Sequence, residues 1–288
     1  MRFSVTKAAF LALTLVFSSF STNLYAQGPF TAEFDDGDLT IQGENNTDQS
    51  LAIEGTGTPG EMRVIALDSG TTINGQNVVV FSGVFGDVTI DLKSGNSLVI
   101  MTEGQSETLY IGGDLEIKNK GNFPAVMLLD EVEVEGRIDI KTKNGDDALI
   151  ANAISSGERT KINTGNGNDV VQIGFDSMIN DELEVKTGGG ADYTMLFLAE
   201  VFGETDIKAG GQEDTIGLYN STLGELSVNG NGGDDLLEEF DVNFLEFDER
   251  SIEDDFVGGL PAMFAQARAF NTNFNDAVVL FGFFNLAD

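Results

Sequence analysis

The sequence predicts an all-β protein: a right-handed parallel β-helix with rungs of about 22 residues and a Phe-rich C-terminal cap. Three observations lead to this prediction. A short segment of alternating apolar and polar residues recurs at nearly constant spacing, a turn rich in Gly, Asn and Asp follows most copies, and the spacing leaves no room for a crossover helix. Strands at this spacing are expected to pair with their equivalents in the next rung, and chirality favours right-handed winding.

The recurring segment has an apolar residue at its centre and alternates with period two, which places successive side chains on opposite faces of a strand. The central residues are Ile90, Ile117, Ile140, Ile162, Val185, Ile207 and Val228, at intervals of 27, 23, 22, 23, 22 and 21 residues. We therefore expect these side chains to stack into one interior column, each packed on its equivalents above and below.

A second apolar strand follows the turn, and a third apolar position comes before the next copy. The predicted second strands are 148–151, 170–173, 193–196 and 215–218, and the predicted third positions are Ile154, Met178, Val201 and Leu223. Three short strands in about 22 residues make one rung of a solenoid.

Both flanks depart from the regular solenoid, which we place at residues 87–240. Residues 27–86 hold strand-like runs at shorter spacing, at 39–41, 51–53, 64–67, 72–73 and 78–81, and these predict first rungs or an N-terminal cap. Residues 241–288 are rich in Phe and are expected to form a C-terminal cap over the open solenoid end, with a short amphipathic helix at 260–270. The alternative for the Phe residues is a patch that docks a partner or a membrane surface.

The first segment, residues 1–26, is predicted to be a secretory signal peptide. Arg2 and Lys7 precede an apolar stretch from Ala8 to Phe20, and the segment ends at Ala26. The stretch is too short to span a bilayer comfortably, and no later apolar run reaches about 18 residues, so no transmembrane anchor is expected in the mature chain. The protein is expected to be secreted or held at the cell surface, with the periplasm as the alternative compartment.

Composition excludes several functional classes. The 288 residues include no Cys and no His, which removes disulfides, thiolate or imidazole metal sites and a Ser-His-Asp triad. Asp and Glu number 48 against 15 Lys and Arg, for a formal charge of -33. Nucleic acid is therefore an improbable partner, because phosphate binding depends on Lys and Arg. Hard cations or basic surfaces complement this charge better.

The charged residues that flank the central positions are expected to lie on the outer face of the solenoid. One column would contain Glu116, Asp139, Lys161, Glu184 and Asp206, and the column beside it Lys118, Lys141, Asn163, Lys186 and Lys208. Such a stripe is either a ligand-binding face or a solvated face with weak ion pairs.

The turns carry the residues that most resemble a known site. Thr164–Gln172 (TGNGNDVVQ) and Thr187–Met195 (TGGGADYTM) resemble the calcium-binding nonapeptide of RTX β-roll proteins, and weaker copies start at Thr142, Ala209 and Gly230. In that family an Asp and the carbonyls of the Gly-rich loop hold Ca²⁺ between stacked turns. The resemblance implies calcium ligands here at Asp147, Asp169, Asp192, Asp214 and Asp235.

Ordinary turn chemistry is the alternative for these residues, since Gly and Asn allow positive φ and Asp accepts hydrogen bonds from the turn backbone. Five stacked carboxylates would repel one another, and either a divalent cation between rungs or outward splaying would relieve that repulsion. As a whole, the chain is similar to bacterial secreted Gly- and Asp-rich β-solenoid repeat proteins, a resemblance that implies surface or matrix roles.

Two functional hypotheses follow. The first is a non-enzymatic structural or adhesive solenoid, stabilised by calcium at its Asp turns, with extracellular polysaccharide or surface proteins as partners. The second is a polysaccharide lyase or glycoside hydrolase, for which the sequence offers the carboxylate pairs Asp146-Asp147 and Asp234-Asp235 with Arg137 and Lys141 nearby. A loop of more than about ten residues, inserted between rungs and forming a walled groove with convergent acids, would favour the enzyme.

Overall fold

A computed structural model describes residues 28–93, 95–104, 108–250 and 254–257. The predicted signal peptide and the predicted helix at 260–270 lie outside the described residues. Within the described part the chain forms strands, turns and bends and no helix, so no helix there is long and apolar enough to cross a membrane.

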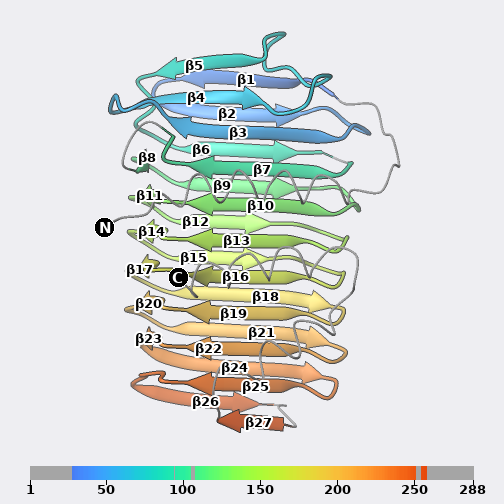
Figure 1. Cartoon of the computed structure of the whole chain (residues 1–288), viewed down its shortest axis with the longest axis vertical. Helices are drawn as coiled ribbons and strands as arrows, with labels where there is room; N and C mark the ends of the chain where they lie inside the picture. The colour runs from blue at the N-terminus through green and yellow to red at the C-terminus, as the bar shows by residue number, and fades with distance from the viewer. Residues whose placement is uncertain (1–27, 94, 105–107, 251–253, 258–288) are drawn as a thin grey trace, which may run out of the picture. The chain divides into compact units, whose positions relative to one another are not determined.

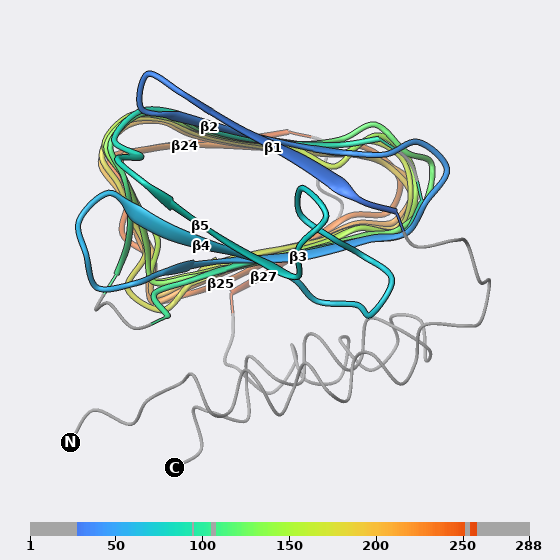
Figure 2. The same ribbon diagram turned by 90° about the horizontal axis from the view of Figure 1, so that it is seen from above.

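Three sheets form the walls of a β-solenoid, with two broad walls facing each other and a narrow wall joining them on one side (Figures 1 and 2). The ten-stranded sheet contains, in spatial order, β1 (Phe30–Asp35), β2 (Asp38–Gly43), β6 (Val88–Leu92), β9 (Leu115–Asn119), β12 (Ile138–Lys141), β15 (Thr160–Asn163), β18 (Leu183–Gly189), β21 (Thr205–Gly211), β24 (Glu225–Gly232) and β26 (Glu246–Arg250).

The eleven-stranded sheet forms the opposite broad wall. Its strands, in spatial order, are β5 (Val78–Ser82), β4 (Glu61–Ala66), β3 (Gln49–Gly55), β7 (Ser97–Thr102), β10 (Ala125–Asp130), β13 (Ala148–Asn152), β16 (Val170–Gly174), β19 (Tyr193–Phe197), β22 (Thr215–Tyr219), β25 (Leu236–Phe240) and β27 (Asp254–Val257). The six-stranded sheet, the narrow wall, contains β8 (Leu109–Ile111), β11 (Val132–Val134), β14 (Ser155–Ser156), β17 (Met178–Ile179), β20 (Glu200–Val201) and β23 (Thr222–Leu223).

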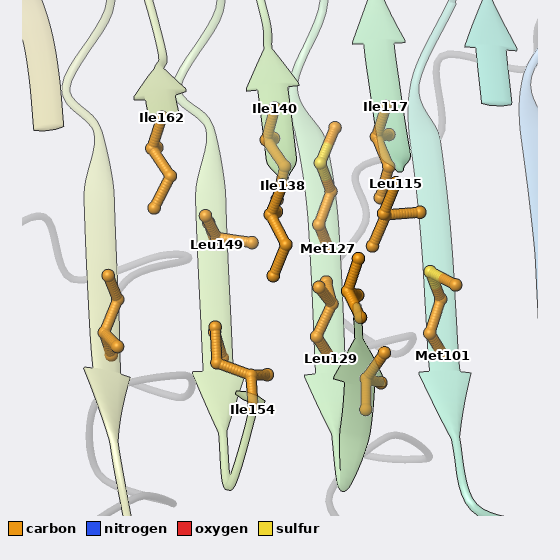
Figure 3. Close-up of a cluster of buried hydrophobic side chains, with 14 of the residues drawn as sticks. Met101, Leu115, Ile117, Met127, Leu129, Ile138, Ile140, Leu149, Ile154 and Ile162 are labelled. Carbon is orange, nitrogen blue, oxygen red and sulfur yellow. The ribbon is translucent and has the colours of Figure 1, made fainter. Parts of the chain in front are cut away.

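The register of the ten-stranded sheet confirms the predicted interior column. Each predicted central residue pairs with the next: Ile90 with Ile117, Ile117 with Ile140, Ile140 with Ile162, Ile162 with Val185, Val185 with Ile207 and Ile207 with Val228. All seven are buried and belong to one apolar core shared with the other two sheets. In Figure 3, Ile117, Ile140 and Ile162 lie on one wall of this core, and Met127, Leu129 and Leu149 belong to strands of the opposite wall.

The second strands are confirmed as β13, β16, β19 and β22, but one third position was wrong. Met178 has 38% of its side chain exposed, whereas its neighbour Ile179 is fully buried and pairs with Val201. The strands of the narrow wall are two or three residues long. The alternation of apolar and polar residues is then too short to show which side chain faces the core. Ile179 is therefore the core residue of that strand.

The N-terminal region combines one parallel rung with antiparallel additions. β2 and β3 pair in parallel with β6 and β7, whereas β1 pairs antiparallel with β2, and β4 and β5 continue antiparallel from β3. In place of the predicted strand at 72–73, Ile73 forms only isolated β-bridges, with Phe30 and Gln76. Seen from above in Figure 2, β4 and β5 run across the end of the solenoid.

Parallel stacking continues beyond residue 240, into the region predicted as the cap. β26 pairs in parallel with β24, and β27 with β25, at offsets of 21 and 18 residues. The apolar pattern fades here because β26 and β27 are rich in acidic residues, yet the backbone keeps the register of the preceding rungs. Parallel pairing therefore extends past residue 240.

Candidate functional site: the aspartate column

The five predicted calcium ligands form an aspartate column (Asp147, Asp169, Asp192, Asp214 and Asp235) inside the wall of the solenoid. Each stands one residue before a strand of the eleven-stranded sheet, and each is at most 2% exposed. Alternation explains the inward direction: Asp147 is two residues before the core residue Leu149, and Asp169 is two residues before Val171. The column therefore faces the interior of the rod.

Each carboxylate in the column binds the backbone of the preceding rung. The Oδ1 atoms of the five residues accept, in chain order, from the N–H groups of Ala125, Asp147, Asp169, Asp192 and Asp214, at 2.7 to 2.9 Å. Each Asp thus supports the rung before it, and Asp147, Asp169, Asp192 and Asp214 also donate their backbone N–H to the Asp of the rung after. Hydrogen bonds between a charged or polar side chain and a buried backbone N–H satisfy donors that a sheet end leaves unpaired.

Threonine hydroxyl groups lie beside the first three carboxyl groups. Thr142 donates to the carbonyl of Thr164 (2.5 Å), Thr164 to that of Thr187 (3.2 Å) and Thr187 to that of Ala209 (2.7 Å). A hydroxyl has one proton, so each of these Thr hydroxyls donates it to a carbonyl of the next rung and has none to donate to an aspartate. The Oδ2 atoms of Asp147, Asp169, Asp192 and Asp214 are buried and have no hydrogen-bond donor among the described residues.

Burial raises the pKa of four of these carboxyl groups and is the largest cause in each case. From the ordinary value of 3.8 the pKa rises to about 8 for Asp147 and Asp214, to about 7 for Asp169 and to about 6 for Asp192. Hydrogen bonds from the backbone lower the pKa, and neighbouring carboxylates raise it further. The folded column therefore holds protons at a pH where an exposed Asp has lost its proton.

These shifts predict that the protein becomes less stable as pH rises from about 4 to about 8. In that window the folded state binds more protons than the unfolded state, whose Asp groups titrate near 3.9, so raising the pH favours unfolding. Each unit of elevation corresponds to about 1.4 kcal/mol, and we expect a loss of more than about 2 kcal/mol, measured by urea unfolding at constant ionic strength.

Asp169→Asn tests the cause, because Asn keeps the acceptor oxygen and cannot ionise. We expect this variant to unfold at higher urea than the native protein at pH 8 and to depend less on pH. The control is Asp234→Asn, which removes one charge from an exposed side chain of the last turn in the column. A pH dependence that both variants reduce equally would show that general charge repulsion, rather than the column, is responsible.

The geometry of the turns bears on calcium. Ca²⁺ takes about six to eight oxygen ligands at about 2.3–2.6 Å. Here Oδ1 of each column residue accepts a backbone proton, and the turn carbonyls of Asn166 and Gly189 accept from Gly145 and Gly167 at 2.9 and 2.7 Å. In the described part of the chain, no group of three or more acidic side chains is placed to hold a metal ion. Among the described residues, the Oδ2 atoms of Asp147, Asp169, Asp192 and Asp214 are the column oxygens without a hydrogen-bond donor.

Calcium binding stays a prediction that a matched-salt comparison can decide. A bound ion would make millimolar CaCl₂ raise the unfolding temperature more than NaCl of equal ionic strength, and the double change Asp169→Asn and Asp192→Asn would remove the difference. Equal melting temperatures in the two salts would leave the column to its backbone hydrogen bonds alone. A calcium-specific increase that the double change abolishes would establish the column as a metal site.

Two further ladders appear that the sequence analysis did not find. Asp38, Asp87 and Asp114 lie at or just before the start of strands of the ten-stranded sheet, and their Oδ1 atoms accept from the N–H groups of Asp87, Asp114 and Arg137 at 2.8, 2.8 and 3.0 Å. The signal was a Gly-Asp pair before an apolar residue, at 37–39, 86–88 and 113–115. On the turns, Asn166 donates to Asn144 (2.8 Å), which donates to Asn122 (2.6 Å).

The predicted charged stripe lies on the outer face of the ten-stranded sheet, in the predicted register. Its ion pairs join neighbours within a rung, as in Lys141–Asp139 (2.6 Å), and across rungs, as in Lys161–Glu184. Burial acts to raise the pKa of Glu184, but Lys161 and Lys186 outweigh it and lower the pKa to about 2. The stripe therefore pairs its own charges.

The carboxylate pairs considered for catalysis do not converge. Asp147 is buried in the interior, whereas Oδ1 of its neighbour Asp146 accepts from the N–H of Asn168 (2.8 Å) nearer the surface. Asp235 is likewise buried, and Asp234 is exposed. Adjacent residues of an extended chain point to opposite sides, so the two acids of each pair cannot flank one glycosidic bond.

Fold and site together define a parallel β-solenoid with a buried ladder of carboxyl groups. Comparison of the chain with protein-family models, with curated proteins and with solved structures finds no match. The functional argument therefore depends on the geometry of this chain alone.

Proposed function

We propose that this chain is a non-enzymatic structural or adhesive solenoid of the cell exterior, which presents its long walls to extracellular polysaccharide or surface proteins. The observation that carries this proposal is the uniform length of the rungs. Between β9 and β25 the longest connections are six residues, at 142–147 and 164–169, and they form the closely stacked turns described above. The longer connection 67–77 joins the antiparallel strands β4 and β5 and is not inserted between the parallel rungs. Such turns give a smooth rod rather than the long loops that wall a catalytic cleft.

The use of polar groups supports the same proposal. The buried carboxyl groups, the turn amides and the outer ion pairs all contact other parts of the rod. These polar and charged side chains therefore join neighbouring rungs. A solenoid in which each rung contacts its neighbours gains stability with every added rung, which suits an extended scaffold. The predicted signal peptide supports an exterior location.

The proposal predicts no turnover of acidic or neutral polysaccharides. We expect incubation with either class to release no unsaturated or reducing ends above a buffer blank, because neither of the candidate pairs, Asp146-Asp147 and Asp234-Asp235, converges on one bond. Retention of the chain on immobilised polysaccharide or on cell surfaces, without turnover, is the expected positive result.

Turnover that disappears in Asp147→Asn would instead support the enzyme hypothesis. The same substitution at Asp169 serves as the control, because both residues occupy equivalent positions in successive rungs. Loss of activity at only one of them would place the chemistry there, whereas loss at both would point to a change in the column as a whole.

A further inference from the structure

β5 forms one edge of the eleven-stranded sheet and, among the described residues, pairs with β4 alone. Ala66 donates to the carbonyl of Asn77 and Gly83 donates to that of Gly60, each at 2.8 Å. Hydrogen-bonded pairs alternate along an antiparallel ladder, so residues 79 and 81 also direct their backbone groups toward β4. The N–H and C=O groups of Val78, Val80 and Ser82 therefore point to the open side.

This edge carries no charge, which is unusual for the molecule. The segment 77–83 reads Asn-Val-Val-Val-Phe-Ser-Gly, in a chain of net charge -33. Val78 and Val80 are 43% and 52% exposed. Proteins normally protect open edges with charges, proline or bulges, and an uncharged apolar edge is a template for another strand.

The sequences of the other edge strands of the two broad sheets contain acidic residues. β27, at the far edge of the same sheet, contains Asp254 and Asp255, and β26 contains Glu246, Asp248 and Glu249. β1 contains Glu33 and Asp35. Two copies of such an acidic chain repel each other at these edges, whereas β5 adds no repulsion of its own.

We propose that β5 pairs antiparallel with β5 of a second copy of this chain, about a twofold axis at Val80. The pairing sets Val80 opposite Val80 and Val78 opposite Ser82, and it satisfies the N–H and C=O groups of these residues on both copies. A symmetric strand of five residues centred on Val80 is self-complementary, which argues for a second copy as the occupant.

The inner side of β5 supports this arrangement. Val79 and Phe81 are half-buried against the core at the end of the solenoid. A second β5 would bring the same two residues alongside and continue the apolar layer from one copy into the other. The result is a rod of twice the length with its acidic ends outward. This inference depends on the fold and not on the proposed function.

Single-cysteine variants give the sharpest test, because the native chain has no Cys. In a hydrogen-bonded antiparallel pair the facing Cα atoms lie about 5.5 Å apart, within the range of a disulfide. Val80→Cys should therefore form a disulfide dimer under mild oxidation. Val78→Cys should not, since the two copies of residue 78 would be about 14 Å apart along the strands. Phe202→Cys, on an exposed residue (55%) of the narrow wall, is the control for random collision.

Sedimentation velocity of the unmodified protein provides the second readout. We expect the mass to double with rising concentration and Val80→Lys to stay monomeric, because it places two ammonium groups opposite each other. Phe202→Lys should dimerise like the native chain. The proposal is overturned if the native chain is monomeric throughout, if Val80→Lys leaves a dimer intact, or if Val80→Cys crosslinks no faster than Phe202→Cys.

Discussion

Replacement of Ile162 by Asp is expected to prevent the chain from folding. The Ile162 side chain is 1% exposed and packs in the interior column between Ile140 and Val185. An aspartate there loses apolar burial and places a carboxylate in a core with no partner, at a cost of more than about 4 kcal/mol. Circular dichroism and urea unfolding of the purified variant measure the effect.

Asn163→Asp is the matched control, because it introduces the same side chain one residue later on the same strand. Position 163 points outward and pairs in register with Lys141 and Lys186. The new carboxylate would therefore face two ammonium groups, and we expect a change within about 1 kcal/mol. Equal unfolding midpoints for the two variants would contradict the interior column.

Gly210→Ala is expected to have the next largest effect. Gly210 pairs with Gly188 in the neighbouring strand and has a φ of +125°, which side chains rarely adopt. A Cβ atom at this position would overlap the carbonyl oxygen of Gly188, a backbone atom that cannot move without separating two rungs. We expect a loss of more than about 2 kcal/mol in urea unfolding, from strain and from displaced rungs.

The adjacent Gly211 supplies the control for this substitution. A Cβ atom at Gly211 would meet no atom closer than the carbonyl oxygen of Gly232, at 4.0 Å. Gly211→Ala should leave stability unchanged or raise it by up to about 1 kcal/mol, because Ala restricts the unfolded chain. If both alanines destabilised equally, the direct stacking of the turns would be refuted.

Periodicity was sufficient to predict the rungs of this protein. In a parallel stack each residue packs on its equivalent, so the same residue type is needed at the same position of every rung, and the spacing from Ile117 to Val228 records that requirement. β26 shows the converse, because it keeps the register of β24 although Glu249, and not an apolar residue, stands opposite Val228.

The aspartate column was predictable in its residues but not in its environment. Recurrence identified Asp147 and Asp169, and a count from Leu149 or Val171 gives their inward direction. The hydrogen bonds could not be read from the sequence, because the donor to Asp169 is the backbone of Asp147, 22 residues earlier. Every residue except proline has such a donor, so no residue type marks the partner.

The sequence by itself determined the strand period, the interior column and the recurrence of Asp at one point in each rung, because all three depend on side-chain types repeated along the chain. Only the tertiary structure decided that Ile179 rather than Met178 enters the core, that β4 and β5 run antiparallel at one end, and that β5 presents an open edge. Those features depend on which backbone groups meet across rungs. They also depend on strands that are too short, or too uniformly apolar, for the alternation of residue types to show which side chains face the core.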